Sequence, residues 1–296
     1  MAPTTLERLA ILDAVASSGT IAGAARSLGY TPSAVSQQLA SLEREARTPL
    51  VERSNRGIAL TSAGQLLAQR SGEILDAVRT AFDDIDSTAN ATRTSLVIAA
   101  FPTAISEILL PLREQLASTI DLSIVDAESE HALEAVTSRA VDGAIIDGYA
   151  HQLRPGLPHL ERTSLRTEPI RLVTRPDRLH ATFDAYSQSD WVIAGPASPI
   201  GHALRLLCHD AGFVPKVIVE TDDHRITFDI IRTCGAVSLL PALALTDLPE
   251  DLVIADQIAL PIERRIEFVT RRALSTNRAI VRLVNALTAP TGVESS

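Results

Sequence analysis

Three short polar side chains share one face of a predicted helix near the start of the chain. In the segment TPSAVSQQLASLERE, residues 31–45, helical spacing places Ser33, Ser36 and Gln37 away from the apolar stripe. Such hydroxyl and amide groups make directional hydrogen bonds, and Gln bonds bidentately to adenine while Ser bonds to several bases. A helix surface built only for solubility would carry Lys and Glu instead. This face therefore predicts contact with the base edges of double-stranded DNA.

The turn before this helix has the features of a helix-turn-helix unit. Thr20 is placed to cap the segment IAGAARSL, which stops at Gly29, and Thr31 to cap the following helix. The turn is short enough for a sharp crossing, with Ala25 and Gly29 as the small residues where the helices approach. In such units the second helix enters the major groove, and the two threonine hydroxyls are placed to meet phosphates.

Apolar stripes predict how the first three helices pack. The positions expected to be buried are Leu6, Leu9, Leu12 and Ala16 in the first helix, Val35, Leu39, Leu42 and Ala46 in the third, and Leu28 and Tyr30 beneath the turn. A plain three-helix bundle would show similar stripes, so the packing alone does not distinguish DNA binding from a structural role.

Arginines follow the predicted reading helix. The segment LVERSNRGIALT, residues 50–61, has two strand-like ends around a polar turn and predicts a hairpin. Arg53 and Arg56 in this turn are placed to reach a flanking minor groove, although solvated loop charge is the alternative. Arg44 lies further along the helix and is expected to meet the phosphate backbone.

Charge is divided unevenly along the chain. The 296 residues carry a net charge of −9, but residues 1–72 hold seven Arg and five acids, a balance of +2. Residues 73–296 hold the other 20 bases and 31 acids, a balance of −11. This asymmetry is expected when only one end of a chain touches nucleic acid.

A long helix with a narrow apolar seam is predicted from Thr61 to about Ala91. The seam is too narrow for a domain core, so the helix is expected to pair with a second copy or lie along a neighbour. The seam residues are Leu67, Ile74, Val78, Ala81 and Ile85.

From residue 96 onward, predicted strands alternate with helices, which implies parallel or mixed sheets covered by helices. The expected strands are 96–101, 122–127, 143–147, 170–174, 191–195, 216–220, 235–241 and 266–270, and the expected helices are 104–117, 130–141, 201–212 and 276–288.

Composition and motifs argue against other classes of protein. The apolar runs are far shorter than the ~18 residues that cross a membrane, and the N-terminal segment lacks an export signal, so a cytoplasmic protein without a membrane partner is expected. A Gly-rich phosphate loop, G-x-S-x-G and H-E-x-x-H are all missing, which argues against an enzyme and against a cofactor. The seven His show no ligand spacing stronger than that of His202 and His209, so no metal site is expected.

The sequence resembles the LysR-type transcriptional regulators. The stretches AARSLGYTPSAVSQQLASLERE and PLVERSNRGIALTSAG are similar to that family's winged helix-turn-helix, and the resemblance continues through ETDDHRITFDIIRTCGAVSLLP and RRIEFVTRR. Two features depart from the family pattern: Pro32 stands one place early, and ARTPLV replaces the commoner segment ahead of the wing. The hallmark positions are Ala24, Ala25, Leu28, Ala34, Val35, Ser36, Leu42, Glu43, Leu50, Arg53, Leu60, Thr61 and Gly64.

The resemblance implies an architecture and a set of partners. A winged helix-turn-helix, mostly α, would span 1–61, a dimerising linker helix 62–91, and an α/β two-lobed effector domain, like periplasmic binding proteins, 92–296. Lobe I would comprise about 92–163 and 264–296, and lobe II about 164–263. Family members bind promoters as dimers or tetramers and respond to a small metabolite, and contact with RNA polymerase is a further partner to consider.

The resemblance also places an effector between the two lobes. The free amides of helix N-termini attract anions, so an anionic effector is considered, while simple helix capping is the alternative role for Thr103 and Ser198. The expected effector residues are Thr103, Asp147, Ser198, His202, Thr221 and Asp222. Peroxide-sensing relatives use a cysteine pair, but Cys208 and Cys234 are expected to be structural.

A solute-binding module and an enzyme are the two alternative functions. The C-terminal two-thirds alone would suit a solute-binding module, but residues 20–61 argue against it. An enzyme of the same two-lobed shape would need a catalytic pair, and the acids are dispersed. The sequence therefore favours a transcription factor whose DNA binding is coupled to a metabolite.

Overall fold

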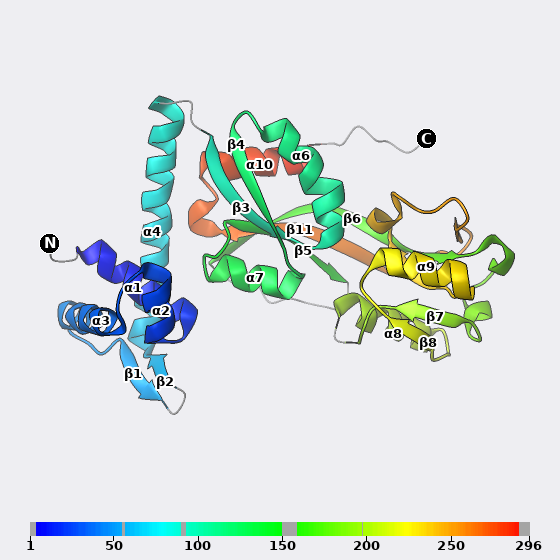
Figure 1. Cartoon of the computed structure of the whole chain (residues 1–296), viewed down its shortest axis with the longest axis horizontal. Helices are drawn as coiled ribbons and strands as arrows, with labels where there is room; N and C mark the ends of the chain where they lie inside the picture. Colours follow the sequence, from blue (N-terminus) through cyan, green and yellow to red (C-terminus); the bar gives the residue numbers. More distant parts are fainter. Residues whose placement is uncertain (1–3, 55–56, 90–92, 150–158, 197, 290–296) are drawn as a thin grey trace.

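The computed structural model describes residues 4–54, 57–89, 93–149, 159–196 and 198–289. The chain forms three parts in a row: an N-terminal helical domain, a lobe around a mixed sheet, and a second lobe (Figure 1). One long helix lies between the N-terminal domain and the first lobe.

The N-terminal domain has the helices and hairpin that the sequence predicts. Thr20 and Thr31 are the N-caps of the second and third helices, and their Oγ1 atoms accept hydrogen bonds from the backbone amides of Gly23 (3.0 Å) and Ala34 (3.2 Å). The second helix ends at Gly29, whose φ of 71° is left-handed. The elements are α1 (Thr5–Ser18), α2 (Ile21–Leu28), α3 (Pro32–Ala46), β1 (Val51–Ser54) and β2 (Gly57–Leu60).

The core of this domain corrects part of the predicted packing. Leu9, Leu12, Val35, Leu39 and Leu42 are buried as expected, and Ile11 and Val15 join them because α1 packs against α2, α3 and α4 and therefore buries a broad face. A Cβ at Gly29 would meet nothing within 4 Å, so this glycine supplies a backbone conformation and not a close approach. The predicted core positions that are exposed instead are Leu6, Ala16, Leu28, Tyr30 and Ala46.

The linker helix α4 (Ser62–Ala89) has 28 residues and is about 42 Å long at 1.5 Å per residue. Its first turns pack against α1, and Ala68 joins the N-terminal core. Further along, α4 reaches the first lobe, so a single helix contacts both domains.

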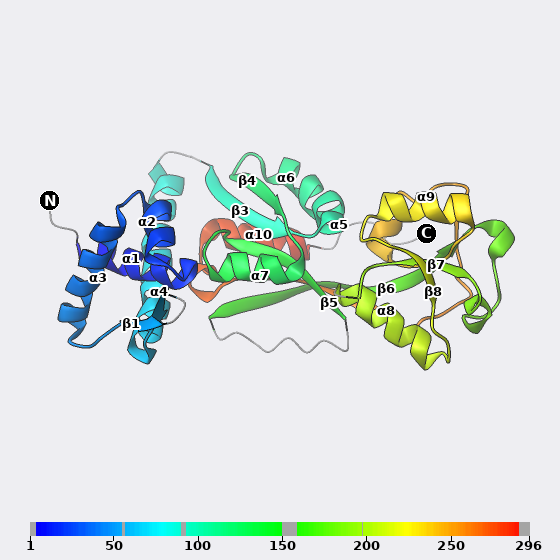
Figure 2. The ribbon, with the colours of Figure 1, turned by 60° about the horizontal axis from the view of Figure 1, so that its bottom comes forward.

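A seven-stranded mixed sheet runs through both lobes. Its order is β10–β6–β11–β5–β3–β4, with β9 paired to β6. The strands β3 (Thr94–Ala100), β4 (Ile120–Asp126) and β5 (Gly143–Tyr149) are parallel, whereas β11 (Glu263–Arg271) is antiparallel to both β5 and β6 (Leu160–Thr174). The strand β6 passes from one lobe to the other (Figure 2), and β11 runs antiparallel beside it (Figure 1). The strand predicted at 170–174 is therefore only the second half of a 15-residue strand.

In lobe I, helices cover both faces of this sheet. Alternate residues of β3 separate the two cores: Leu96 and Ile98 face one side, and Ala99 faces the other. The first face is covered by α5 (Pro102–Ala104), the π-helical turn Ile105–Leu109, α6 (Leu110–Leu116) and α10 (Arg278–Thr288). The other is covered by α7 (Ser129–Thr137), which ends four residues before the predicted limit of 141; Arg139 then adopts a left-handed φ of 63°.

Lobe II is built around β7 (Asp190–Ile193) and β8 (Lys216–Glu220). The strand β9 (Ser238–Pro241) contacts β7 and pairs with β6 of the long sheet, to which β10 (Val253–Ile254) also pairs. The helices of lobe II are α8 (Pro199–Asp210) and α9 (His224–Cys234), and α9 was not predicted.

Trp191 is fully buried, and its indole donates to the backbone oxygen of Tyr186. Cys208 is buried as expected, and burial raises the pKa of its thiol to about 11; Cys234 is exposed. None of the helices in the described part of the chain is long and apolar enough to cross a membrane.

Candidate DNA-reading face and effector cleft

The outward side of α3 presents the three predicted polar residues to solvent. Ser33, Ser36 and Gln37 are all exposed. The Ser36 hydroxyl donates to the carbonyl of Pro32 at 2.9 Å, and Ser33 shares a 3.0 Å hydrogen bond with Thr31. The side-chain amide of Gln37 has no hydrogen-bond partner within the described residues. Gln37 thus has both a donor and an acceptor free for an external group.

The arginines near this face lie in different settings. The Arg44 guanidinium is exposed and bonded to its own helix, through Ala40 O at 3.3 Å and Ser41 Oγ at 2.8 Å. Arg53 was predicted in the hairpin turn but belongs to β1, where it pairs with Ile58. Arg56 lies outside the described residues.

The base of the hairpin is held by groups that sequence reasoning named only as family hallmarks. The Glu43 carboxylate accepts hydrogen bonds from the amides of Leu50 (2.8 Å) and Val51 (3.2 Å), which ties the first strand to α3. Thr61 donates to the carbonyl of Pro49 at 2.8 Å. A Cβ on Gly64 would lie 1.9 Å from Leu50 O, so only glycine fits there. These contacts fix the hairpin relative to the reading helix.

A cavity of about 540 Å³ lies between the two lobes. Five of the six predicted effector residues line it, namely Thr103, Asp147, Ser198, Thr221 and Asp222. His202 does not: it is exposed on the second turn of α8 and is no part of the described lining. This volume suits a small organic molecule.

Two of these residues differ from the predicted geometry. Thr103 was expected to cap the helix after β3, but Phe101 occupies the N-cap position and Thr103 is buried inside the short helix. Its hydroxyl accepts a hydrogen bond from Arg264 at 3.3 Å. Ser198 does hold the N-cap position of α8, but its side chain makes no capping hydrogen bond. Thr103 therefore contributes to the wall of the cleft and not to helix capping.

The floor of the cleft contains a buried ion pair that sequence reasoning missed. The Arg264 guanidinium bonds to Glu168 at 2.5 Å, lies 3.7 Å from Asp147, and stacks over the Phe101 ring at 4.8 Å from its centroid. Both Arg264 and Glu168 are buried, and Glu168 also accepts a hydrogen bond from the Leu243 amide. No local sequence signal links two residues 96 positions apart.

Acidic side chains from both lobes face the remaining space. Glu128 is exposed to the cavity, but the walls of the cleft remove part of its water, and this raises the pKa of its carboxyl. The nearby carboxylates of Asp147, Asp222 and Asp126 raise this pKa further, and the charge of Arg264 opposes them. Asp147 is held by Ser129, whose hydroxyl donates to it at 2.6 Å. Burial and the charge of Arg264 lower the pKa of His224, which is therefore neutral at pH 7.

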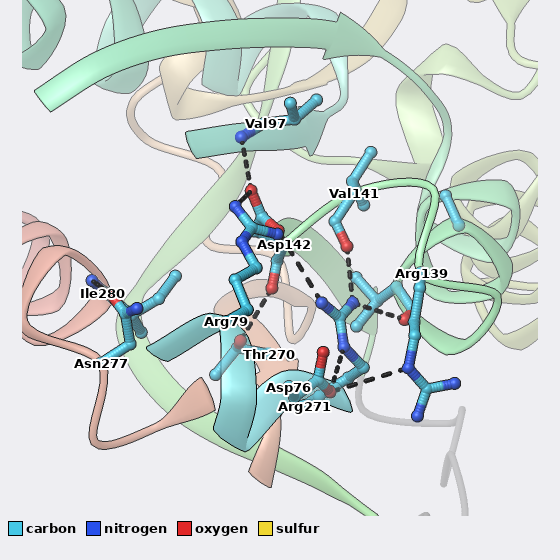
Figure 3. Close-up of polar contacts among 12 residues, drawn as sticks. Asp76, Arg79, Val97, Arg139, Val141, Asp142, Thr270, Arg271, Asn277 and Ile280 are labelled. Carbon is cyan, nitrogen blue, oxygen red and sulfur yellow. Dashed lines mark hydrogen bonds and ion pairs between the residues drawn. The ribbon is translucent and has the colours of Figure 1, made fainter. Parts of the chain in front are cut away.

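A second polar cluster joins α4 to lobe I (Figure 3). We call it the ionic cluster; its central residues are Asp13, Asp76, Arg79, Arg139, Asp142 and Arg271. Arg271 bonds to Asp76 at 2.9 Å and to the carbonyls of Val136 and Val141. Asp142 accepts from Arg79 and from the amide of Val97 at 2.9 Å.

Arg139 extends the ionic cluster to the N-terminal domain. Its guanidinium bonds to Asp13 of α1 at 2.6 Å and lies 3.7 Å from Asp76 of α4. It packs directly over Gly72, where an added Cβ would lie 1.3 Å from its Nη2 atom. One side chain of lobe I therefore contacts both the linker helix and the first helix of the chain.

Comparison with known proteins agrees with this architecture. Residues 6–65 match the bacterial regulatory helix-turn-helix protein model of the lysR family, and residues 89–290 match the LysR substrate binding domain. The chain belongs to the LysR family: it is a DNA-binding transcriptional regulator with an effector-binding domain, and not an enzyme. The family resemblance, the fold class and the general function predicted from the sequence are thus confirmed.

Similar proteins span nearly the whole chain. The regulator CbbR of Rhodospirillum rubrum is 29% identical over 270 residues, which cover 89% of each protein. A full-length OxyR variant from Pseudomonas aeruginosa aligns with a TM-score of 0.68 and 17% identity, covering 98% of this chain and 96% of its own. Full-length CbnR in complex with its target DNA aligns with a TM-score of 0.54 and 21% identity, covering 96% of this chain and 98% of its own.

Proposed function

We propose that this regulator reads promoter DNA with Ser33, Ser36 and Gln37 of α3. The observation that carries the proposal is the N-terminal half of the outer face of α3, which is exposed and uncharged and where the Gln37 amide has no partner within the described residues. Bidentate hydrogen bonding to adenine needs such a free amide. We propose that Thr20 and Thr31 meet the phosphate backbone with their hydroxyls, and Arg44, Arg53 and Arg56 with their guanidinium groups.

We further propose that two copies pair through α4. The predicted seam supports this proposal because Ile74 is 44% and Ile85 is 60% exposed, and Ala81 is exposed as well. Leu67 and Val78 are half-buried. Leu66 and Phe82 add exposed apolar surface to the same helix. Pairing would bury this surface and join two weakly binding DNA-reading domains into one tighter unit, a dimer or a tetramer.

In this proposal residues 1–61 read DNA, residues 62–91 pair, and residues 92–296 bind the effector, with lobe I at 92–163 and 264–296 and lobe II at 164–263. Thr103, Asp147, Ser198, Thr221 and Asp222 would line the effector site. A protein that acts on chromosomal promoters works in the cytoplasm, and contact with RNA polymerase stays a prediction.

The route of coupling that we propose is β11. Arg264 stands at the cleft end of this strand, and Arg271 at its other end is part of the ionic cluster. Seven residues of strand span about 23 Å. An effector that moves lobe II relative to lobe I would act on β11 and hence on α4, and the angle between paired DNA-binding domains would convert this movement into affinity.

The proposed reading face is tested by Gln37→Ala. Specific binding to the operator is expected to weaken by about 1–3 kcal/mol, with little change in nonspecific binding, because the lost hydrogen bonds read a base. Electrophoretic mobility shift with operator and scrambled duplexes at one salt concentration measures both. Gln65→Ala, an exposed amide on α4, is the matched control. Equal loss on both duplexes would remove Gln37 from the reading face.

The proposed pairing is tested by Ile74→Asp. A charge in the seam is expected to shift the protein toward the monomer, because the carboxylate would have to be buried between helices. Light scattering across a dilution series measures the species. Gln69→Asp, at an exposed position on the same helix outside the seam, should leave the oligomer intact. An unchanged oligomer in the Ile74 variant would refute the seam.

A further inference from the structure

Carboxylates face the cleft from both lobes. Glu128, at the N-cap position of α7, and Asp147, in β5, belong to lobe I, whereas Asp222, between β8 and α9, belongs to lobe II. All three line the cavity. Asp147 and Asp222 both act on Glu128 through their negative charge. The two lobes therefore present like charges to each other.

The bases of the cleft do not balance its acids. Arg264 is already bonded to Glu168, which does not line the cavity, and lies 3.7 Å from Asp147. The single charge of Arg225 follows Asp222 and Asp223 in the chain. His224 is neutral at pH 7 because burial lowers its pKa. Six acidic side chains line the described cavity against these two arginines: Glu107, Glu128, Asp147, Asp222, Asp223 and Asp247.

We propose that the effector of this regulator is an organic cation, carrying a protonated amine or a guanidinium, held between Glu128 and Asp147 of lobe I and Asp222 of lobe II. The inference rests on the proposed effector cleft and specifies its ligand. A cation there forms charge-assisted hydrogen bonds and removes the repulsion between the lobes. Binding therefore favours closer approach of lobe II to lobe I, which is the movement that coupling through β11 requires.

The arrangement fits an organic cation better than a metal ion or an anion. Among the described residues, no three His, Cys, Asp or Glu side chains lie close enough together to hold a metal ion. An organic cation spans separated carboxylates, and the cavity of about 540 Å³ has room for one. An anion would meet an excess of carboxylates, and the guanidinium at the floor is already paired. The cleft therefore favours a cationic effector, whereas an anionic one was considered from the sequence because helix N-termini attract anions.

The test is thermal unfolding of the full-length protein with matched probes. Agmatine, cadaverine and arginine at about 10 mM are expected to raise Tm by about 2 °C or more, because a ligand that binds the folded state stabilises it. Glutarate, the anionic counterpart of cadaverine, and magnesium chloride at the same ionic strength are expected to leave Tm unchanged.

A double variant locates the binding. Glu128→Gln with Asp222→Asn is expected to weaken cation binding at least about tenfold in calorimetry, since two charge-assisted contacts are lost. Glu130→Gln with Asp256→Asn removes the same charge from exposed positions that do not line the cavity, and should bind the cation as the unaltered protein does.

Three results would overturn the cationic effector: no shift with any of the cations, a larger shift with glutarate or magnesium, or undiminished cation binding by the cleft double variant. Operator binding by the same preparations separates this inference from the proposed function. A protein that binds operator through Gln37 and ignores every cation contradicts only the charge of the effector. A protein that binds no duplex contradicts the proposed reading face.

Discussion

The ionic cluster and the effector cleft are both rich in charged groups, but they are composed differently. In the ionic cluster three arginines meet three aspartates, and Asp76, Asp142 and Arg271 are buried. In the cleft the lining acids outnumber the arginines, and Glu128 and Asp222 are exposed to the cavity. A buried carboxylate without a partner costs several kcal/mol, whereas one facing water does not. Balanced, buried charge therefore joins elements of the fold, and unbalanced, accessible charge is left for a ligand.

The ion pair at the floor of the cleft, Arg264 with Glu168, resembles the ionic cluster because its charges are buried and balanced. Arg264 and Glu168 are 4% and 3% exposed and satisfy each other, although they lie beside the cavity. The relevant distinction is thus between paired and unpaired charge, and it does not follow the boundary between the two sites.

The largest expected change in the free energy of unfolding comes from disrupting the ionic cluster. Arg271→Met should lower the free energy of unfolding by about 3–5 kcal/mol, because Asp76 loses its buried partner and two carbonyls lose their donor. Urea denaturation measures the change. Arg265→Met, at an exposed position of the same strand, should change stability by less than about 0.5 kcal/mol. Equal effects of the two substitutions would remove the distinction between paired and unpaired charge.

A smaller effect is expected where the cluster reaches the N-terminal domain. Gly72→Ala should cost about 1 kcal/mol, because the new methyl group displaces the Arg139 guanidinium from Asp13 and Asp76. The cost is modest because the displaced atoms are at the end of a flexible side chain. A double-mutant cycle with Arg139→Ala measures this coupling. Once Arg139 is truncated, Gly72→Ala should cost nothing or slightly stabilise α4, because Ala favours a helix more than Gly does. An undiminished cost in the double variant would mean that the added methyl group clashes with a group other than Arg139.

The smallest effect is expected in the cleft and depends on pH. The folded protein raises the pKa of Glu128 above its ordinary value of 4.5, so it binds this proton more tightly than the unfolded chain. Stability from this group is therefore present below the unfolded pKa and lost as pH rises through the folded pKa. Glu128→Gln should match the unaltered protein at low pH and exceed it at pH 7 by less than about 1 kcal/mol, since Glu128 is exposed.

Denaturation at several pH values tests this sign. The charges that act on Glu128 are those of Asp147, Asp222, Asp126 and Arg264. The control is Glu130→Gln, which removes an exposed carboxylate of α7 that does not line the cavity. If Glu128→Gln destabilises the protein at pH 7, the Glu128 carboxylate is paired, and the charges of the cleft then resemble those of the ionic cluster.

Local features of the N-terminal domain were predictable from sequence. The caps at Thr20 and Thr31 join groups three residues apart, and the exposure of Ser33 and Gln37 follows from helical period. Predictions failed where a distant element decides burial. Leu28 and Tyr30 were expected inside but are exposed, whereas Ile11 and Val15 of α1, which were not predicted, belong to the core of the domain.

The cleft was predictable in its location and less so in its chemistry. Family resemblance predicted that Thr103 and Asp222 share one site, and both line the same cavity although they come from different lobes. It also included His202, which points to solvent because its place on α8 is fixed by packing within lobe II. The Arg264–Glu168 pair and the raised pKa of Glu128 depend on charges brought together across the sheet, and no spacing in the chain records them.

The amino-acid order alone determined the secondary-structure signals, the helix caps, the polar face of α3 and the division of charge, because each depends on neighbours within a few turns or on composition. Tertiary structure decided which charges are paired. Asp76 and Arg271 are 195 residues apart, and Asp13 and Arg139 are 126 apart. Coulomb energy depends on distance in space and on exclusion of water, and only the folded chain sets both.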